Sequence, residues 1–219
     1  MPFSPLHLVL LIILLAVLIA IVQVGVLSIA LERLGLSPEA GMTVLFASLF
    51  GSMINLPLFR MKTSAPDLPV TQRWPGLLRP PLPPFSAETL VAVNVGGCLI
   101  PFSLCLYLLT HIDLDLATVV VAVSGVSAVC YFASRPVPGI GIGMPIFVAP
   151  ITAALLGVLL DGGNSAPLAY IGGTLGVIIG ADILRLGAIR TMGAPLASIG
   201  GAGTFDGIFI TGIVAVLLA

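Results

Sequence analysis

Residues 168–186 read LAYIGGTLGVIIGADILRL, an apolar stretch that carries one acid, Asp182, close to its end. The chain then passes through a short connector and reaches GTFDGIFI at residues 203–210, where Asp206 precedes the last apolar stretch. An ionised carboxylate is costly inside hydrocarbon, so an acid within a membrane-spanning segment is a functional-site hypothesis. Whether the two acids lie in a membrane, and at one depth, depends on the rest of the chain.

The composition is that of a membrane protein. Of the 219 residues, 58% are hydrophobic and only 8% are charged, and the mean hydropathy is +1.23. Soluble domains contain about 25% charged residues, which leaves this chain unable to cover a water-exposed surface. The net charge of −1 gives no basic surface for a nucleic-acid partner. The cysteines and histidines lack the spacing of metal ligands, so neither a metal nor another cofactor is predicted.

The apolar stretches divide into about seven segments, each near the length of about 20 residues that a transmembrane helix needs. We predict an all-α, polytopic membrane protein with a single helical domain over residues 1–219. A proline-rich stretch over residues 60–86 cannot form a helix interior and is predicted to be a cytoplasmic loop. The predicted spans are 8–31, 40–59, 88–110, 116–133, 144–160, 168–186 and 203–219.

The basic residues divide unequally between the two sides that these spans define. Arg33 falls on one side, and the other side, which bears the N-terminus, holds Arg60, Lys62, Arg73, Arg79, Arg135, Arg185 and Arg190. Basic residues favour cytoplasmic loops, so we predict a cytoplasmic N-terminus and an external C-terminus. The expected location is a lipid bilayer, the bacterial cytoplasmic (inner) membrane.

In this topology the two acids meet at one depth. Span 168–186 runs toward the cytoplasm and span 203–219 runs away from it, and antiparallel helices joined by a short connector are natural neighbours. Two carboxylates held close together in a low dielectric share a proton, so that one acts as a base while the other polarises a carbonyl. Asp182 and Asp206 are therefore candidate catalytic residues. Gly203 and Gly207 would let a substrate backbone approach closely.

The segment Gly203-Thr-Phe-Asp206-Gly-Ile-Phe-Ile resembles the Gly-x-Gly-Asp motif of presenilins and signal peptide peptidases. The resemblance covers the last two spans. It implies an intramembrane aspartyl protease with Asp206 and Asp182 as its two catalytic aspartates, and a transmembrane or membrane-inserted peptide as substrate. Phe205 stands where that motif has its second glycine, Ala181 where those proteases usually have tyrosine, and their later Pro-Ala-Leu motif is absent. The whole chain also resembles a bacterial integral-membrane family of unknown function.

Two other interpretations of the acids remain open. In a structural one, Asp182 pairs with Arg185 or Asp206 caps the start of the last helix. In the other, the acids bind a proton or a cation in a coupled membrane transporter. Interruptions such as Asn55-Leu-Pro57 and Asn94-Val-Gly-Gly97 favour transport, because secondary transporters place unwound backbone at their binding sites. Asn94 is added to the candidate substrate-binding residues.

Overall fold

The computed structural model describes residues 5–63, 88–137, 141–191, 196–201 and 207–219. Most of these residues are helical, and short strands join several of the helices. The elements in chain order are α1 (Pro5–Arg33), α2 (Pro38–Gly51), β1 (Asn55–Lys62), β2 (Glu88–Asn94), the π-helix η1 (Val95–Leu99), α3 (Ile100–His111), α4 (Leu116–Ala133), β3 (Arg135–Val137), β4 (Gly141–Gly143), α5 (Val148–Leu160), α6 (Ser165–Val177), the π-helix η2 (Ile178–Ile183), the 3₁₀-helix η3 (Leu186–Thr191), β5 (Leu196–Ile199) and α7 (Gly207–Leu218).

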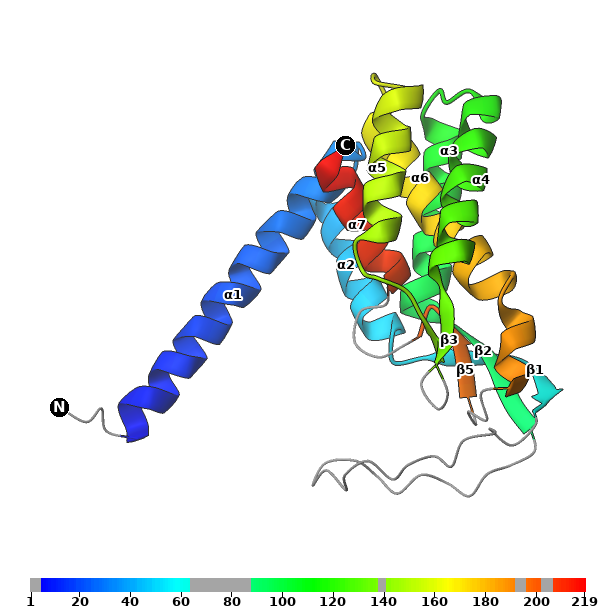
Figure 1. The fold of residues 1–219 in the computed structure, drawn as a ribbon. Helices are drawn as coiled ribbons and strands as arrows, with labels where there is room; N and C mark the ends of the chain where they lie inside the picture. The colour runs from blue at the N-terminus through cyan, green and yellow to red at the C-terminus, as the bar shows by residue number, and fades with distance from the viewer. Residues whose placement is uncertain (1–4, 64–87, 138–140, 192–195, 202–206) are drawn as a thin grey trace.

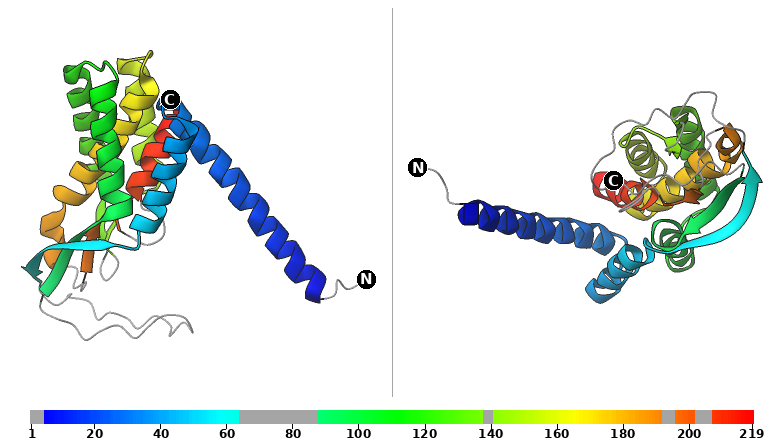
Figure 2. Two further views of the ribbon diagram at one scale, coloured as in Figure 1. Left: turned by 180° about the vertical axis from the view of Figure 1, so that it is seen from behind. Right: turned by 90° about the horizontal axis from the view of Figure 1, so that it is seen from below.

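Helices α2 to α7 form a bundle with the small strands gathered at one end (Figure 1). Helix α1 leaves this bundle at its C-terminal turn and projects away from it, as the views from behind and below also show (Figure 2). The two helices that surround this turn are bent by 119° relative to each other. Arg33 fastens the turn to α7, because its Nη1 donates to the carbonyl oxygen of Val216 at 3.2 Å.

Side chains before the first turn fix where two of the helices begin. Ser37 precedes α2 and its Oγ accepts a hydrogen bond from the Ala40 amide at 3.3 Å. Asp115 precedes α4, and its Oδ2 accepts from the amide and the hydroxyl of Thr118 at 2.9 and 2.8 Å. These bonds favour the ionised carboxylate and lower the pKa of Asp115, the hydroxyl of Thr118 having the larger effect.

A three-stranded sheet with the order β1-β2-β5 crosses the end of the bundle. Strand β2 pairs antiparallel with β1 and parallel with β5. Segments 40–59 and 88–110 were predicted to be continuous helices. The first changes from helix to strand before Asn55, and the second changes from strand to helix after Asn94. The all-α prediction is therefore wrong at this end of the bundle. The apolar residues of these strands were predicted to be the ends of helices, because a short apolar run shows neither the helical nor the strand period clearly.

The prediction of seven spans is not supported. Among the described residues, two helices are long and apolar enough to cross a membrane, Leu116–Ala133 and Ser165–Arg190, and a third crossing results if the bent pair Gln23–Arg33 and Pro38–Gly51 is one span. The other apolar helices, Val95–His111, Val148–Leu160 and Gly207–Leu218, are shorter. Strand residues take up part of spans 40–59 and 88–110, and residues 144–147 precede α5 in span 144–160, so the helices there are shorter than predicted. These apolar helices are consistent with a location in a membrane.

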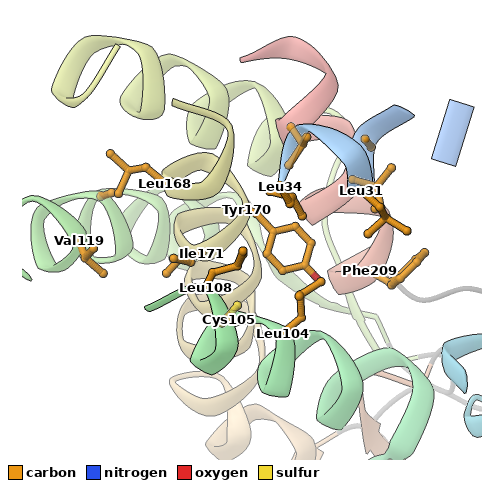
Figure 3. Packing of buried hydrophobic residues seen from close by; sticks show 14 of the residues in the cluster. Leu31, Leu34, Leu104, Cys105, Leu108, Val119, Leu168, Tyr170, Ile171 and Phe209 are labelled. Carbon is orange, nitrogen blue, oxygen red and sulfur yellow. The ribbon is translucent and has the colours of Figure 1, made fainter. Parts of the chain in front are cut away.

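The core of the bundle lies around α6, which neighbouring helices surround. Tyr170 on α6 is fully buried and its ring lies among Leu34, Leu104 and Phe209 (Figure 3). Gly212 on α7 makes room for this ring, because a Cβ at that position would lie 2.7 Å from Tyr170 Cε2. Close packing of α7 on α6 thus depends on a small residue at the contact, as is common between membrane helices.

Candidate functional site

Asp182 lies in η2, the π-helical continuation of α6, and is half-buried. Gly180 brings this segment close to α4, since a Cβ there would collide with the carbonyl oxygen of Ser127. One turn of π-helix inside an α-helix is often found at a functional site, because it redirects the side chains that follow. The Asp182 carboxylate interacts electrostatically with the Cys130 thiol of α4.

Arg185 contacts Tyr131 of α4. Its Nη2 donates to the carbonyl oxygen of Tyr131 at 2.5 Å, and its guanidinium lies 4.2 Å from the centre of the Tyr131 ring. These contacts join Arg185 to α4, and whether Asp182 pairs with Arg185, as in the structural interpretation, stays a prediction.

Helix α7 packs against α6 and runs antiparallel to it. At the far end of the pair, the Ser165 hydroxyl at the start of α6 donates to the carbonyl oxygen of Ala219 at 3.2 Å. At the near end, Ile208 is buried in one apolar cluster with Ile178 and Ala181 of η2. The residue after Asp206, Gly207, is exposed, and a Cβ there would meet nothing within 4 Å.

The chain approaches this place through β5 and a tight turn. Ile199 packs against the same apolar cluster as Ile208. Gly200 follows with φ = +73°, a left-handed conformation that favours glycine. A Cβ on Gly200 would also lie 2.6 Å from Cys98 Cβ, so the turn contacts the backbone of η1 closely. The described residues on both sides of 202–206 are thus fixed in the cluster that contains Ala181.

Of the predicted site residues, Asp206 and Gly203 lie outside the described residues. The flanking residues Ile199 and Ile208 pack in the apolar cluster that contains Ala181, and whether the two carboxylates meet stays a prediction. The roles predicted for Gly207 and for Gly203 in substrate binding also stay predictions.

Asn94 is buried, with 2% of its surface exposed, at the end of β2. Its Nδ2 donates to the carbonyl oxygen of Ser52 at 2.7 Å and to Asn55 Oδ1 at 3.1 Å, and its Oδ1 accepts from the Gly97 amide at 2.7 Å. These bonds join the end of α2 to the start of η1 and use most of the hydrogen-bonding capacity of the amide. A role of Asn94 in binding substrate stays a prediction.

Two polar residues next to Asn94 were not predicted as part of a site. Asn55 Oδ1 also accepts from the Ser198 hydroxyl at 2.5 Å, so Asn55, Asn94 and Ser198 link all three strands of the sheet. A sequence signal for Ser198 exists, because Ser198-Ile-Gly-Gly201 repeats the pattern of Asn94-Val-Gly-Gly97. Each pattern begins at or near the end of a strand, β2 for Asn94 and β5 for Ser198.

Most of the described charged residues separate by sign between the two ends of the bundle, although Glu88 lies among the cations at the strand end. The strand end carries exposed Arg60, Lys62, Arg135 and Arg190, while Asp115 and Asp161 stand in the helix connections at the other end (Figure 1). Asp161 holds its connection through bonds from Asn164, which lower its pKa. Within the described part of the chain, no group of three or more His, Cys, Asp or Glu residues could hold a metal ion.

The fold and the site define a mostly helical protein with apolar helices of membrane-spanning length and an acid at the end of the most buried one. The family model described as "Protein of unknown function (DUF1614)" matches residues 49–218, and the chain belongs to this family. The matched region begins near the end of α2 and includes the sheet, α6 and α7. No presenilin or protease family model matches. No curated protein and no solved structure matches the chain either.

Proposed function

We propose that this protein is an intramembrane aspartyl protease that hydrolyses peptide bonds of membrane-embedded substrates with Asp182 and Asp206. The observation that carries the proposal is the shared apolar cluster: Ala181, which precedes Asp182, packs in it together with Ile199 and Ile208, which flank the segment containing Asp206. The resemblance of residues 203–210 to the Gly-x-Gly-Asp motif supports aspartyl protease chemistry for the two acids. A dyad needs its two carboxyl groups within reach of one water molecule.

In this mechanism one carboxylate removes a proton from water as the water attacks the scissile carbonyl carbon. The other carboxyl group is protonated and donates a hydrogen bond to the carbonyl oxygen, where negative charge develops. The proton then passes to the leaving amine, and the pair returns to its singly protonated state. Because the two groups share a proton, the rate is expected to have a bell-shaped pH dependence.

The sheet supplies a place for an extended substrate. Strand β5 pairs with β2 on one side, and among the described strands it is an edge of the sheet. An edge strand offers free backbone donors and acceptors to a peptide that adds as a further strand. A peptide bound along β5 would lie next to the segment that leads into Asp206, so its backbone would reach the acids in extended form.

The experiment is a cleavage assay in proteoliposomes, with a single-pass transmembrane peptide labelled at both ends as substrate. Asp182→Asn and Asp206→Asn should each reduce the cleavage rate at least about 100-fold, the usual contribution of a general acid or base. Asp113→Asn, in the connection between α3 and α4, is the matched control and should cleave as the wild type does. Full cleavage by both dyad variants, with their fold intact by size-exclusion chromatography, would refute the proposal.

A second function, proton- or cation-coupled transport by the same acids, is favoured by a different observation. The helical elements are interrupted at two neighbouring places, and the carbonyl of Ser52 meets the buried amide of Asn94 there. Secondary transporters use such discontinuous elements at their binding sites. Proton entry into sealed vesicles, followed with an internal pH-sensitive dye, separates the two functions. Transport predicts flux that Asp182→Asn abolishes, and proteolysis predicts none.

A further inference from the structure

The strands β1 and β2 form a ribbon that extends from the end of the bundle beyond the helices (Figures 1 and 2). Almost every residue of β1 is exposed, although the strand contains Leu56, Leu58 and Phe59. We propose that this ribbon lies in the membrane interface, with one face in the hydrocarbon boundary and the other bound to the phosphate headgroups of anionic phospholipids. The proposal does not depend on the chemistry of the two acids.

Pairing within the sheet decides which residues share a face. Residues directly opposite each other on neighbouring strands point to the same side. Val93 pairs with Leu56 on β1 and with Ile199 on β5. Both Val93 and Ile199 pack against the apolar cluster of the bundle, so this face of the sheet points toward the helices. Leu56 therefore lies on the bundle side of the ribbon.

A bulge at Leu58 makes the ribbon amphipathic. In a regular strand, Leu56, Leu58 and Arg60 would share one face, because side chains alternate with a period of two residues. The register shift between Pro57 and Phe59 instead pairs Phe59 with Val91 and Arg60 with Leu90. Phe59 thus joins Leu56 on the bundle side, and Arg60 points to the opposite side.

Past the helices, the described part of the chain leaves the bundle-side face of the ribbon exposed. Val91 on β2 is completely buried, yet its partner Phe59 is 47% exposed and Leu56 is 43% exposed. These apolar side chains point in the direction in which the apolar helices extend. Lipid acyl chains are the material that surrounds helices of this composition, and they would cover Leu56 and Phe59.

The opposite face carries basic side chains. Arg60 and Lys62 pair with Leu90 and Glu88 and therefore share this face. Glu88 is 3.5 Å from Arg60, but the two side chains are 50% and 73% exposed, so this pair is weak and leaves the guanidinium accessible. Arg190 adds a third charge at the edge of the ribbon, where its carbonyl oxygen accepts from the Thr63 hydroxyl at 2.8 Å.

Charge complementarity identifies the partner. Three exposed cations against one carboxylate favour an anionic surface, and an apolar face that is continuous with the helices places this surface at the edge of a bilayer. A basic residue near an anionic membrane surface strengthens binding about fivefold. Loss of Arg60 and Lys62 together should therefore weaken the binding of anionic lipid roughly 25-fold.

Native mass spectrometry of the detergent-solubilised full chain tests the basic face. Phosphatidylglycerol should bind more tightly than phosphatidylcholine, and Arg60→Gln with Lys62→Gln should remove most of this preference. The matched control is Arg135→Gln, an exposed cation on β3 at the same end of the bundle but off the ribbon, which should retain the preference. Equal binding of the two lipids by the wild type, an unchanged preference in the double variant, or an equal loss in the control would overturn the proposal.

Fluorescence quenching tests the apolar face independently. The single tryptophan, Trp74, is replaced by phenylalanine and Phe59 by tryptophan, and the protein is reconstituted into vesicles of phosphatidylglycerol brominated on the acyl chains. Bromine atoms quench tryptophan only at contact, so the emission of the new tryptophan should fall strongly compared with unbrominated vesicles. Unquenched emission would show that Phe59 faces water and would overturn the interfacial placement.

Discussion

Replacing Asn94 by alanine should destabilise the protein by about 3 kcal/mol. The side chain makes three hydrogen bonds, to Ser52, Asn55 and Gly97, at 2.7, 3.1 and 2.7 Å, and a hydrogen bond contributes about 1 kcal/mol on average. The true value can exceed this sum because Asn94 is buried, and its removal leaves a carbonyl oxygen and an amide without partners.

The free energy of unfolding is measured for wild type and variant by titration of mixed micelles with a denaturing detergent. Ser103→Ala on α3 is the matched control. Its hydroxyl donates locally to the carbonyl oxygen of Ile100 at 2.8 Å and is exposed, so its loss should change the stability by less than about 0.5 kcal/mol. If Asn94→Ala and Ser103→Ala lowered the stability equally, the reasoning that Asn94 holds the junction of helix and strand would be refuted.

Two further predictions concern backbone contact and helix capping. Gly96→Ala should prevent native packing, because a Cβ at this position would collide with the carbonyl oxygen of Ser48, a backbone atom that cannot move independently; expression followed by size-exclusion chromatography should show aggregation or loss of the monodisperse peak. Asp115→Ala should lower the thermal unfolding midpoint at neutral pH, since it removes the bonds from Thr118 at the start of α4. Because the folded pKa of Asp115 is lowered, its stabilisation is complete above the pKa of the unfolded chain and disappears as the pH falls through the folded value. Unfolding midpoints of wild type and variant should therefore converge only in strong acid, and a difference that persists there would contradict the capping role.

The sequence was sufficient to locate the apolar helices but not their ends. The predicted span 116–133 coincides with α4, because a polar residue before it and Ser134 after it interrupt the apolar pattern. Span 88–110 failed because β2 and α3 follow each other as one apolar run, and only the pairing with β1 and β5 makes the first part a strand. Such pairing joins residues far apart in the chain, so the local hydrophobic pattern cannot predict it.

Only part of the candidate site could be predicted from the sequence. Asp182 stood out because one acid in an apolar run is rare. The antiparallel arrangement of α6 and α7 was predicted from a connector expected to be short, although η2, η3 and β5 lie between the two helices. The π-helical form of η2 and the contact of Arg185 with Tyr131 could not be predicted, because both depend on how α4 packs against Gly180. The link between Asn55 and Ser198 likewise arises only when the sheet forms.

Cross-linking of positions 182 and 206 tests most directly whether the two acids form one site. In a background with Cys98, Cys105 and Cys130 replaced by alanine, Asp182→Cys and Asp206→Cys should form a disulfide under mild oxidation, because a disulfide requires the two Cβ atoms to lie about 3.5–4.5 Å apart. Mass spectrometry of the digested protein identifies the linked peptides. We expect rapid and nearly complete cross-linking in the membrane. Absence of the disulfide in the folded protein, under oxidants small enough to reach the site, would contradict the account.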